Sequence, residues 1–296
     1  MFHWICSKCG TQYNAASNPP LQCEICMDER QYVGREGQEW ITLEQLQADG
    51  YKTEFKEEET NLIGIGIIPK FAIGQRALLV QTTEGNVLWD CIPFIDEDTE
   101  LEIRRLGGLT AIAISHPHYY STMAEWAERF EVPIYVHEDD RKWVFRESKW
   151  LRFWSGESYR ILPGVTLVRL GGHFPGSAVL HWSEGAEGEG SLLTGDTIYV
   201  VEDRKWVSFM YSYPNLIPLS ADTILRIKEA IAEYRFDRLY SAWFGKRVES
   251  DARRAVLKSA ERYILGLKGH LDGKYKGASE KHAEQEQTAV ELDEED

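Results

Sequence analysis

Nine residues, ISHPHYYST at positions 114–122, place two histidines one residue apart directly after an apolar run. His116 and His118 occupy positions i and i+2, so both imidazoles can point to one face while Pro117 stiffens the bend between them. Two imidazoles placed in this way can share a metal ion. Because pairs of loop histidines are commonplace, the pair alone leaves two hypotheses open, half of a metal site or two ordinary histidines.

Two later segments have the same design. GGHFPGS, 171–177, puts His173 in a Gly-Gly-His turn after a predicted strand, and LLTGDT, 192–197, puts Asp196 at the end of another. In each case an apolar strand leads into a tight turn that carries a side chain able to bind a metal.

Four cysteines form a second candidate metal site near the start of the chain. Two Cys-x2-Cys pairs, separated by thirteen residues, are what a tetrahedral thiolate site requires: Cys6, Cys9, Cys23 and Cys26. The stretch has little apolar material to fold around, so we predict a structural Zn²⁺ site, with Fe possible because both metals accept tetrahedral thiolates. It resembles a zinc ribbon or rubredoxin-type knuckle pair, and a closed site of this kind serves stability or partner contact. The fifth cysteine, Cys91, is predicted to be a small buried hydrophobe.

The elements around these residues predict an α+β fold. Strands are expected in a first block at 62–69, 76–82 and 86–91, followed by a strand, helix and strand at 109–115, 121–130 and 132–137. A second block covers 164–172, 178–182 and 191–196, and the chain then continues with a helix at 221–234, a strand at 238–243 and a helix at 251–267. Two blocks of strands with interspersed helices indicate two packed sheets with helices outside.

The order HxH, then GGH-x-PGS, then TGD resembles the metallo-β-lactamase superfamily over roughly residues 61–250. WDCIPF, 89–94, is similar to the family's early strand that ends in Asp, which makes Asp90 a support for the site. The resemblance implies a four-layer αββα sandwich with the site on loops at one edge, preceded here by the zinc-ribbon-like module.

This chain departs from the family pattern at two places. The family motif HxHxDH has Tyr120 at its Asp position and Ser121 at its last His, and the late loop carries Trp243 and Phe244 where a further His is usual. The resemblance therefore implies one metal ion, Zn²⁺ or Fe²⁺, on His116, His118 and His173 with Asp196 available. Tyr120 is the candidate proton or hydrogen-bond donor.

The resemblance implies a metal-dependent hydrolase in which one metal ion activates water against a small ester, thioester, lactone or amide. One alternative is a mononuclear Fe(II) oxygenase-type redox enzyme that uses His116, His173 and Asp196. The other is a non-catalytic metal-binding protein whose four-cysteine module recruits a protein partner. The missing second metal position disfavours a nuclease.

Charge and hydropathy limit the partners. The formal net charge of −15 argues against nucleic acid, because phosphate contacts need clustered Lys and Arg. No apolar run approaches the roughly 20 residues of a membrane span, and the N-terminal residues do not have the pattern of a signal peptide, so a cytoplasmic protein without membrane contact is expected. The predicted divisions are the four-cysteine module 1–35, a connector 36–60, the main domain 61–270 and an acidic disordered tail 271–296.

Two aromatic stretches lie near the predicted site. WVFRESKWLRFW, 143–154, is interpreted as a helix that covers the sandwich or as an aromatic wall over the metal. SFMYSYPNLIPLS, 208–220, follows the TGD turn and could line the same pocket. Neither stretch identifies a substrate.

Overall fold

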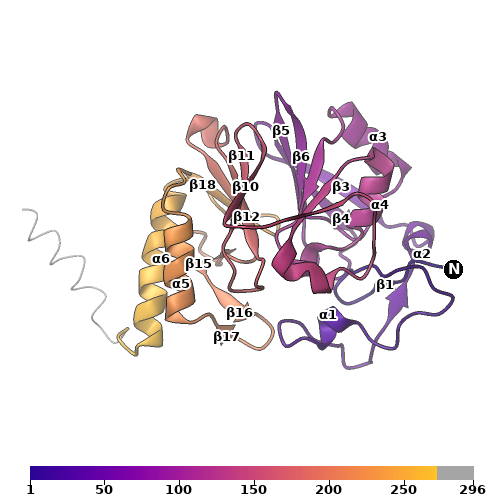
Figure 1. Ribbon diagram of the computed structural model, residues 1–296, viewed down its shortest axis with the longest axis horizontal. Coiled ribbons are helices and arrows are strands. Elements are labelled where there is room, and N and C mark those ends of the chain that lie inside the picture. Colours follow the sequence, from indigo (N-terminus) through magenta and orange to yellow (C-terminus); the bar gives the residue numbers. More distant parts are fainter. Residues whose placement is uncertain (272–296) are drawn as a thin grey trace, which may run out of the picture.

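The computed structural model describes residues 1–271 and consists of two β-sheets packed face to face, with helices on both outer faces (Figure 1). The larger sheet has seven strands in sequential order: β3 (Lys52–Glu59), β4 (Leu62–Ile68), β5 (Ala77–Thr82), β6 (Gly85–Trp89), β7 (Ala111–Ala113), β8 (Ile134–His137) and β9 (Leu151–Trp154). The smaller sheet has six strands in the order β10 (Ser158–Leu162), β11 (Val165–Arg169), β12 (Ala178–Trp182), β13 (Ser191–Gly195), β18 (Arg238–Ser241) and β19 (Arg247–Val248).

Alternation along the strands builds the core between the sheets. In β5, Leu78 and Val80 point toward the second sheet, whereas Leu79 points toward the outer helices, as expected for side chains that alternate across a strand. Trp89 and Trp182 contribute to the same inner cluster, and both are almost completely buried. The two sheets therefore share one apolar layer.

Helices complete the four layers. α3 (Glu97–Arg105) and α4 (Met123–Phe130) lie with the larger sheet, and α5 (Ala221–Ala230) and α6 (Ala252–Leu267) pair on the outside of the smaller one (Figure 1). The N-cap of α6 is Asp251, the residue at which the predicted helix begins. The predicted αββα sandwich is confirmed. Two short hairpins, β14 (Tyr199–Val200) with β15 (Val207–Ser208) and β16 (Met210–Ser212) with β17 (Ile217–Pro218), follow the TGD turn.

Part of the predicted connector belongs to the larger sheet. The charged stretch after α2 (Leu43–Ala48) forms the edge strand β3 and pairs antiparallel with β4. Its acids have partners elsewhere in the fold, since Glu58 pairs with the buried Arg76 and Glu59 accepts a hydrogen bond from Ser191 at 2.8 Å. A charged edge strand is common because charge opposes edge-to-edge association.

The prediction of a helix over residues 143–154 is wrong. The 3₁₀ helix η2 (Glu138–Trp143) ends at the start of this stretch. A loop follows and leads into β9, which pairs parallel with β8. Leu151, Phe153 and Trp154 favour a strand, and an available sheet edge overrides the helical spacing of the tryptophans.

The four-cysteine module packs onto the main domain. It contains β1 (Ile5–Cys6), α1 (Glu24–Met27) and β2 (Trp40–Ile41), and its apolar residues join the cluster outside the larger sheet. The Tyr13 ring stacks on Phe145 at 4.8 Å, and the backbone N–H of Gln12 donates to the carbonyl of Ser121 at 3.2 Å. The module thus contacts the loop that carries the HxH motif.

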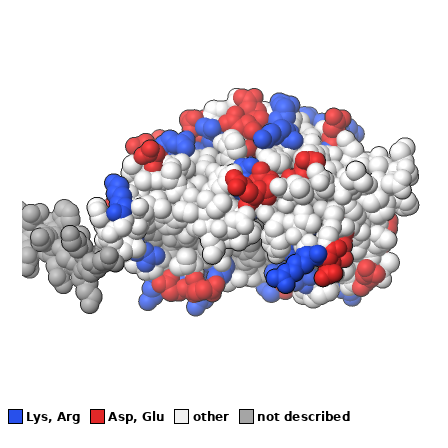
Figure 2. Space-filling view, turned by 90° about the horizontal axis from the view of Figure 1, so that it is seen from below, with Lys and Arg blue, Asp and Glu red and all other residues white. Residues whose placement is uncertain are grey.

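Seen from below, broad uncharged areas separate small groups of Lys, Arg, Asp and Glu, and one mainly acidic group lies near the middle of the face (Figure 2). Within residues 1–271, no helix is long and apolar enough to cross a membrane. The acidic tail predicted to be disordered lies, from residue 272 onward, outside the described residues.

Candidate metal centre

The predicted ligands lie on loops at one edge of the sandwich. His116 and His118 follow β7, His173 lies in the turn between β11 and β12, and Asp196 follows β13. The Ser115 carbonyl accepts a hydrogen bond from the Ala178 backbone N–H at 2.9 Å, which joins the end of β7 to the start of β12. Ligands far apart in the sequence therefore meet because strands from both sheets end at this edge.

The four side chains converge. His116 Nε2 lies 2.9 Å from Asp196 Oδ1, and His173 Nε2 lies 3.2 Å from His118 Nδ1. One candidate ligand atom from each of the four residues lies within 4.8 Å of the other three, and all four residues are buried. A single cation could contact the whole set.

The hydrogen bonding of the cluster supports a metal site. His173 Nδ1 is 3.1 Å from the Met210 carbonyl, which can only accept, so this nitrogen carries the proton and the Nε2 lone pair faces the cluster. Among residues 1–271, His116 Nε2 and Asp196 Oδ1 are buried without a hydrogen-bond partner, although they approach closely. Buried polar atoms are rarely left unpaired, and a bound cation would satisfy both of these.

Burial and charge keep the cluster in the protonation states that a metal needs. Burial lowers the pKa of His173 to about 4 and that of His118 well below its ordinary value, so both rings are neutral at pH 7. Burial opposes ionisation of Asp196, but His116 and His173 outweigh it and hold the pKa of the carboxyl well below its usual range. Neutral imidazoles and a carboxylate are good metal ligands.

Asp90 and Ser115 support the first histidine. Asp90 Oδ1 accepts a hydrogen bond from the backbone N–H of Ser115 at 2.7 Å, and the Ser115 hydroxyl lies 2.9 Å from His116 Nδ1. Burial raises the pKa of Asp90 to about 7. A side chain at Gly195 would have its Cβ only 2.7 Å from the Ser115 hydroxyl, so the glycine of the TGD motif makes room for this contact.

Asp140 positions the His173 turn, a role that the sequence did not reveal. It lies in η2, is almost fully buried, and accepts a hydrogen bond from the Gly176 backbone N–H at 3.0 Å. Its second carboxylate oxygen has no hydrogen-bond partner in the described part of the chain, and burial raises its pKa to about 6. The only signal was an aspartate in a polar run after β8, which is too weak to single out a residue.

The two tyrosines of the HxH motif point in different directions. The Tyr120 hydroxyl reaches the main-chain oxygen of Asp140 at 3.5 Å. The Tyr119 ring packs against His116 with a centroid distance of 4.6 Å. The Tyr119 hydroxyl is buried without a hydrogen-bond partner in residues 1–271, and burial followed by the Asp196 charge raises its pKa well above 10. Tyr119 rather than Tyr120 therefore contacts the cluster.

The positions that depart from the family pattern have other contacts. The Ser121 hydroxyl accepts a hydrogen bond from Gln75 Nε2 at 3.0 Å. Trp243 lines the pocket beside the cluster, and its Nε1 donates to the Ile73 carbonyl at 3.4 Å. Phe244 lies against the backbone of Gly64 and Gly66, where a Cβ would approach the ring to 2.6 Å.

A cavity of 290 Å³ opens beside the cluster. His118 and Asp196 lie on its wall, Tyr213 lines it from the β16–β17 turn, and Trp243 lines it from the loop after β18. The Tyr213 hydroxyl donates to the Asp196 carbonyl at 2.7 Å, and Tyr213 and Pro214 of the 208–220 stretch both line the pocket. In the 143–154 stretch, Trp143 instead packs on Phe174 at 5.7 Å, behind the histidines.

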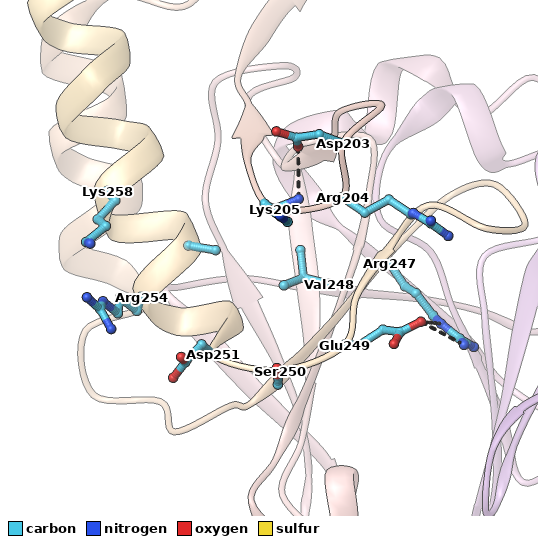
Figure 3. A pocket seen from close by; sticks show the side chains of 11 residues that line it. Asp203, Arg204, Lys205, Arg247, Val248, Glu249, Ser250, Asp251, Arg254 and Lys258 are labelled. Atoms are coloured by element: carbon cyan, nitrogen blue, oxygen red, sulfur yellow. Dashed lines mark hydrogen bonds and ion pairs between the residues drawn. The ribbon is translucent and has the colours of Figure 1, made fainter. Parts of the chain in front are cut away.

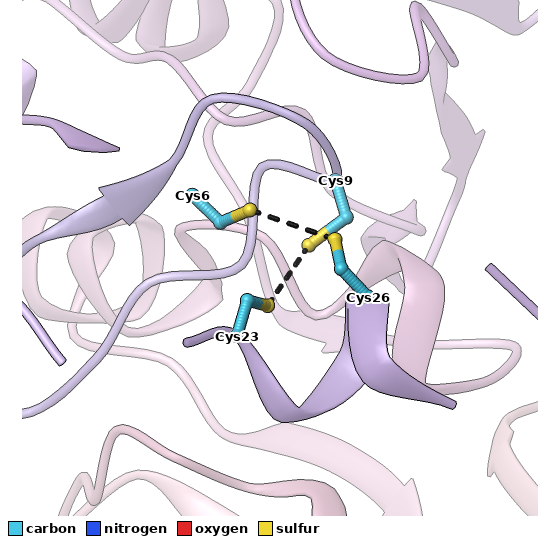
Figure 4. A group of neighbouring side chains, drawn as sticks. All are labelled: Cys6, Cys9, Cys23 and Cys26. Carbon is cyan, nitrogen blue, oxygen red and sulfur yellow. Dashed lines mark hydrogen bonds between the residues drawn. The ribbon is translucent and has the colours of Figure 1, made fainter. Parts of the chain in front are cut away.

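The four cysteines also converge (Figure 4). All are buried and reduced, and the pairs Cys6–Cys26 and Cys9–Cys23 each have sulfur atoms 3.6 Å apart. Tetrahedral Zn–S bonds of about 2.3 Å place sulfurs roughly 3.8 Å apart, close to the observed separation. Contacts with Cys23 and then Cys26 lower the pKa of Cys6, which favours the thiolate form.

Donors surround these sulfurs. The Tyr13 hydroxyl donates to Cys23 Sγ at 3.3 Å, and Gln38 Nε2 donates to Cys6 Sγ at 3.2 Å. Such hydrogen bonds stabilise thiolates and orient metal ligands. The fifth cysteine, Cys91, is buried away from this cluster, as predicted, and burial raises the pKa of its thiol.

A larger cavity of 460 Å³ lies between the β14–β15 turn, the segment after β19 and α6 (Figure 3). Basic and acidic side chains line it together, among them Lys205, Arg254 and Asp251. Neither metal-capable cluster of residues 1–271 lies there, so we place the candidate site at the smaller cavity.

Comparisons with known proteins agree with this fold. The family model of the metallo-beta-lactamase superfamily matches residues 73–243. The uncharacterized protein YmaE of Bacillus subtilis (strain 168) is 53% identical over 272 residues, which cover 92% of this chain and 99% of that protein. Among solved structures, VMB-1 has a TM-score of 0.55 at 13% identity, covering 73% of this chain and 98% of that chain. FIM-1 from Pseudomonas aeruginosa, in its mono-zinc form, has a TM-score of 0.52 at 12% identity, and the match covers 72% of this chain and 96% of the FIM-1 chain. This chain belongs to the metallo-beta-lactamase superfamily.

Proposed function

We propose that this protein is a metal-dependent hydrolase that uses one cation, Zn²⁺ in our assignment, held by His116, His118 and His173, with Asp196 available beside them and one position left for water. The observation that carries the proposal is the convergence of four buried candidate ligands, with His116 Nε2 and Asp196 Oδ1 lacking a hydrogen-bond partner in the described chain. A divalent cation bound there supplies a Lewis acid and lowers the pKa of a water molecule that it binds. The substrate class is a small ester, thioester, lactone or amide.

The residues that differ from the family's metal-binding motifs have contacts that support a single cation. Ser121 accepts a hydrogen bond from Gln75, and Trp243 donates to Ile73, so neither position offers a free ligand to a second ion. Neither a serine hydroxyl nor an indole replaces the histidines that a second cation of this family would need. The FIM-1 crystal structure is described as a mono-zinc form, so one protein of this fold holds a single zinc ion.

Two buried tyrosines beside the cluster carry neutral hydrogen-bond donors. Burial keeps the pKa of Tyr119 well above 10, so the group stays protonated and can donate a hydrogen bond to an oxyanion or leaving group. Tyr213 is also buried and protonated, but its hydroxyl is already engaged with the Asp196 carbonyl. We therefore assign the donor role to Tyr119, and the role predicted for Tyr120 stays a prediction.

The same geometry weighs against the oxygenase alternative. A mononuclear Fe(II) oxygenase needs two histidines and one carboxylate with open positions, whereas here His118 lies 3.2 Å from His173 and joins the set. A third histidine departs from the two-histidine, one-carboxylate set of such oxygenases. The adjoining cavity, in turn, favours turnover over a purely structural metal site.

The cysteine cluster is proposed to hold a structural Zn²⁺. Four buried sulfurs with tetrahedral spacing leave no position for substrate. Its proposed contribution is stability of the module, because metal binding at such sites is coupled to folding.

Metal analysis tests the proposal directly. We expect two zinc ions per wild-type chain, one in His116→Ala and one in Cys6→Ser, and we expect His116→Ala to abolish hydrolysis of a panel of esters, thioesters, lactones and amides. His270→Ala, an exposed histidine outside the cluster, should retain both ions and full activity. One ion in the wild type that persists in His116→Ala rejects the site, three ions reject the single cation, and iron at the histidines favours oxygenase chemistry.

A further inference from the structure

The cavity beside the histidine cluster is partly built by the four-cysteine module. Lys8 lies between the cysteines of the first pair, and Arg30, Gln31 and Tyr32 follow the second pair, and all four line the cavity that also contains His118 and Asp196. Figure 1 shows the module beside the β16–β17 hairpin, below the sandwich. The module is therefore in position to contact a substrate.

Direct hydrogen bonds hold this wall in place. Arg30 Nη1 donates to the carbonyl of His173 at 3.1 Å, and the Arg30 guanidinium lies 3.9 Å from the centre of the Phe174 ring. The carbonyl of Glu29 accepts hydrogen bonds from the Ser212 hydroxyl at 2.6 Å and from Asn215 Nδ2 at 2.7 Å. The module is thus fixed to the His173 turn and to the β16–β17 hairpin.

The charges on the cavity wall are mostly positive. Lys8, Arg30 and Lys70 line it, and Asp196, the candidate metal ligand, is the one acidic residue of the lining within residues 1–271. Arg30 is paired with Asp28 at 2.6 Å. Lys8 and Lys70 form no salt bridge with a carboxylate of residues 1–271. The full sequence carries a net charge of −15. Two unpaired cations at one cavity of an acidic protein favour an anionic ligand.

Both lysines have close neighbours at the cavity. Lys8 Nζ lies 2.5 Å from the Tyr32 hydroxyl and 3.9 Å from the centre of the Tyr32 ring. The Lys70 stem lies across Gly74, since a Cβ there would be 2.2 Å from Lys70 Cε. The contacts with Tyr32 hold the Lys8 ammonium group in place without a carboxylate partner, so little entropy is lost when it binds an anion.

We propose that the four-cysteine module completes the substrate pocket and that Lys8 and Lys70 bind an anionic group of the substrate, a carboxylate or a phosphate. This inference rests on the proposed function for the nature of the reacting bond. The cavity of 290 Å³ accommodates a small molecule, with its anionic group at the lysines and its reacting group toward His118 and Asp196.

Calorimetric titration of the zinc-loaded protein tests the proposal without relying on turnover. The probes are glutaramate, its neutral counterpart glutaramide, and methyl phosphate. We expect glutaramate or methyl phosphate to bind at least about tenfold more tightly than glutaramide, and Lys8→Gln and Lys70→Gln each to weaken the anion about tenfold. The tighter of the two anions distinguishes carboxylate from phosphate recognition.

Control variants separate the possible causes of weaker anion binding. Lys268→Gln, an exposed lysine on the far helix, should leave every affinity unchanged. Lys8→Gln must retain the cysteine-bound metal, and Lys70→Gln tests the same pocket from outside the module. Equal affinity for all three probes overturns the proposal, as does anion binding that is lost in His118→Ala but insensitive to both lysines. Anion binding that depends on the lysines, without hydrolysis of any substrate, would reject the proposed hydrolase function and support the proposed anion-binding pocket.

Discussion

At the scale of single residues, adjacent tyrosines have different surroundings. The Tyr119 hydroxyl is buried beside the cluster without a partner in residues 1–271, whereas Tyr120 reaches the Asp140 carbonyl. We expect Tyr119→Phe to lower kcat by about 10²-fold or more, as for loss of a general acid, and to leave stability unchanged or raise it by about 1 kcal/mol. Tyr120→Phe is the matched control and should retain kcat. A larger kcat loss in Tyr120→Phe would assign the donor role to Tyr120.

Asp140 gives a prediction about pH. Burial raises its folded-state pKa to about 6, from an ordinary value of 3.8, so its contribution to stability is fully present below pH 3.8 and is lost as the pH rises through 6. Asp140→Asn cannot titrate. Between pH 4 and pH 7, the unfolding free energy of Asp140→Asn should therefore rise relative to that of the wild type by up to about 3 kcal/mol. Urea unfolding at several pH values measures it, with the exposed Asp222→Asn as control, and a constant difference would contradict the assignment.

At the scale of elements, a hydrogen bond joins the cysteine module to the His173 turn. Arg30 donates to the His173 carbonyl, and the segment that carries Arg30 follows directly after the second cysteine pair. Cys6→Ser should remove the cysteine-bound metal and loosen this contact, so we expect the affinity of the histidine cluster for Zn²⁺ to fall about 10- to 100-fold.

Competition with a chelator, followed by metal analysis, measures this coupling. Cys91→Ala removes a buried cysteine that lies outside the cluster and should retain both metals. Full zinc affinity of the histidines in Cys6→Ser, with the cysteine site empty, would show that the two centres are independent.

At the scale of the whole molecule, a buried arginine joins the two sheets. Arg76 precedes β5 of the larger sheet, donates to the Ser241 carbonyl of β18 at 3.1 Å, and pairs with Glu58 of β3. Arg76→Met leaves Glu58 buried without this partner, and we expect a loss of about 3–5 kcal/mol in unfolding free energy. Arg105→Met breaks an exposed pair with Glu102 and should cost less than about 1 kcal/mol. Comparable losses in the two variants would contradict a linking role for Arg76.

The sequence by itself determined the fold class and the set of candidate ligands. Alternating apolar residues and Gly-containing turns are local signals, so β5, β12 and β13 could be located, and His173 and Asp196 could be placed at strand ends. The cysteine spacing was equally local. These signals do not depend on how distant segments pack.

Only the tertiary structure decided which elements surround the ligands. The charged strand β3 and the strand β9 form because an existing sheet edge offers them partners, which local propensity does not report. The directions of Tyr119 and Tyr120 follow from packing against His116 and Asp140. Lys8 reaches the pocket because the module docks on loops more than a hundred residues away along the chain, as the contact between Arg30 and His173 shows. Contacts of that separation leave no periodic trace in a single sequence, so the role of the module in the pocket could come only from the folded chain.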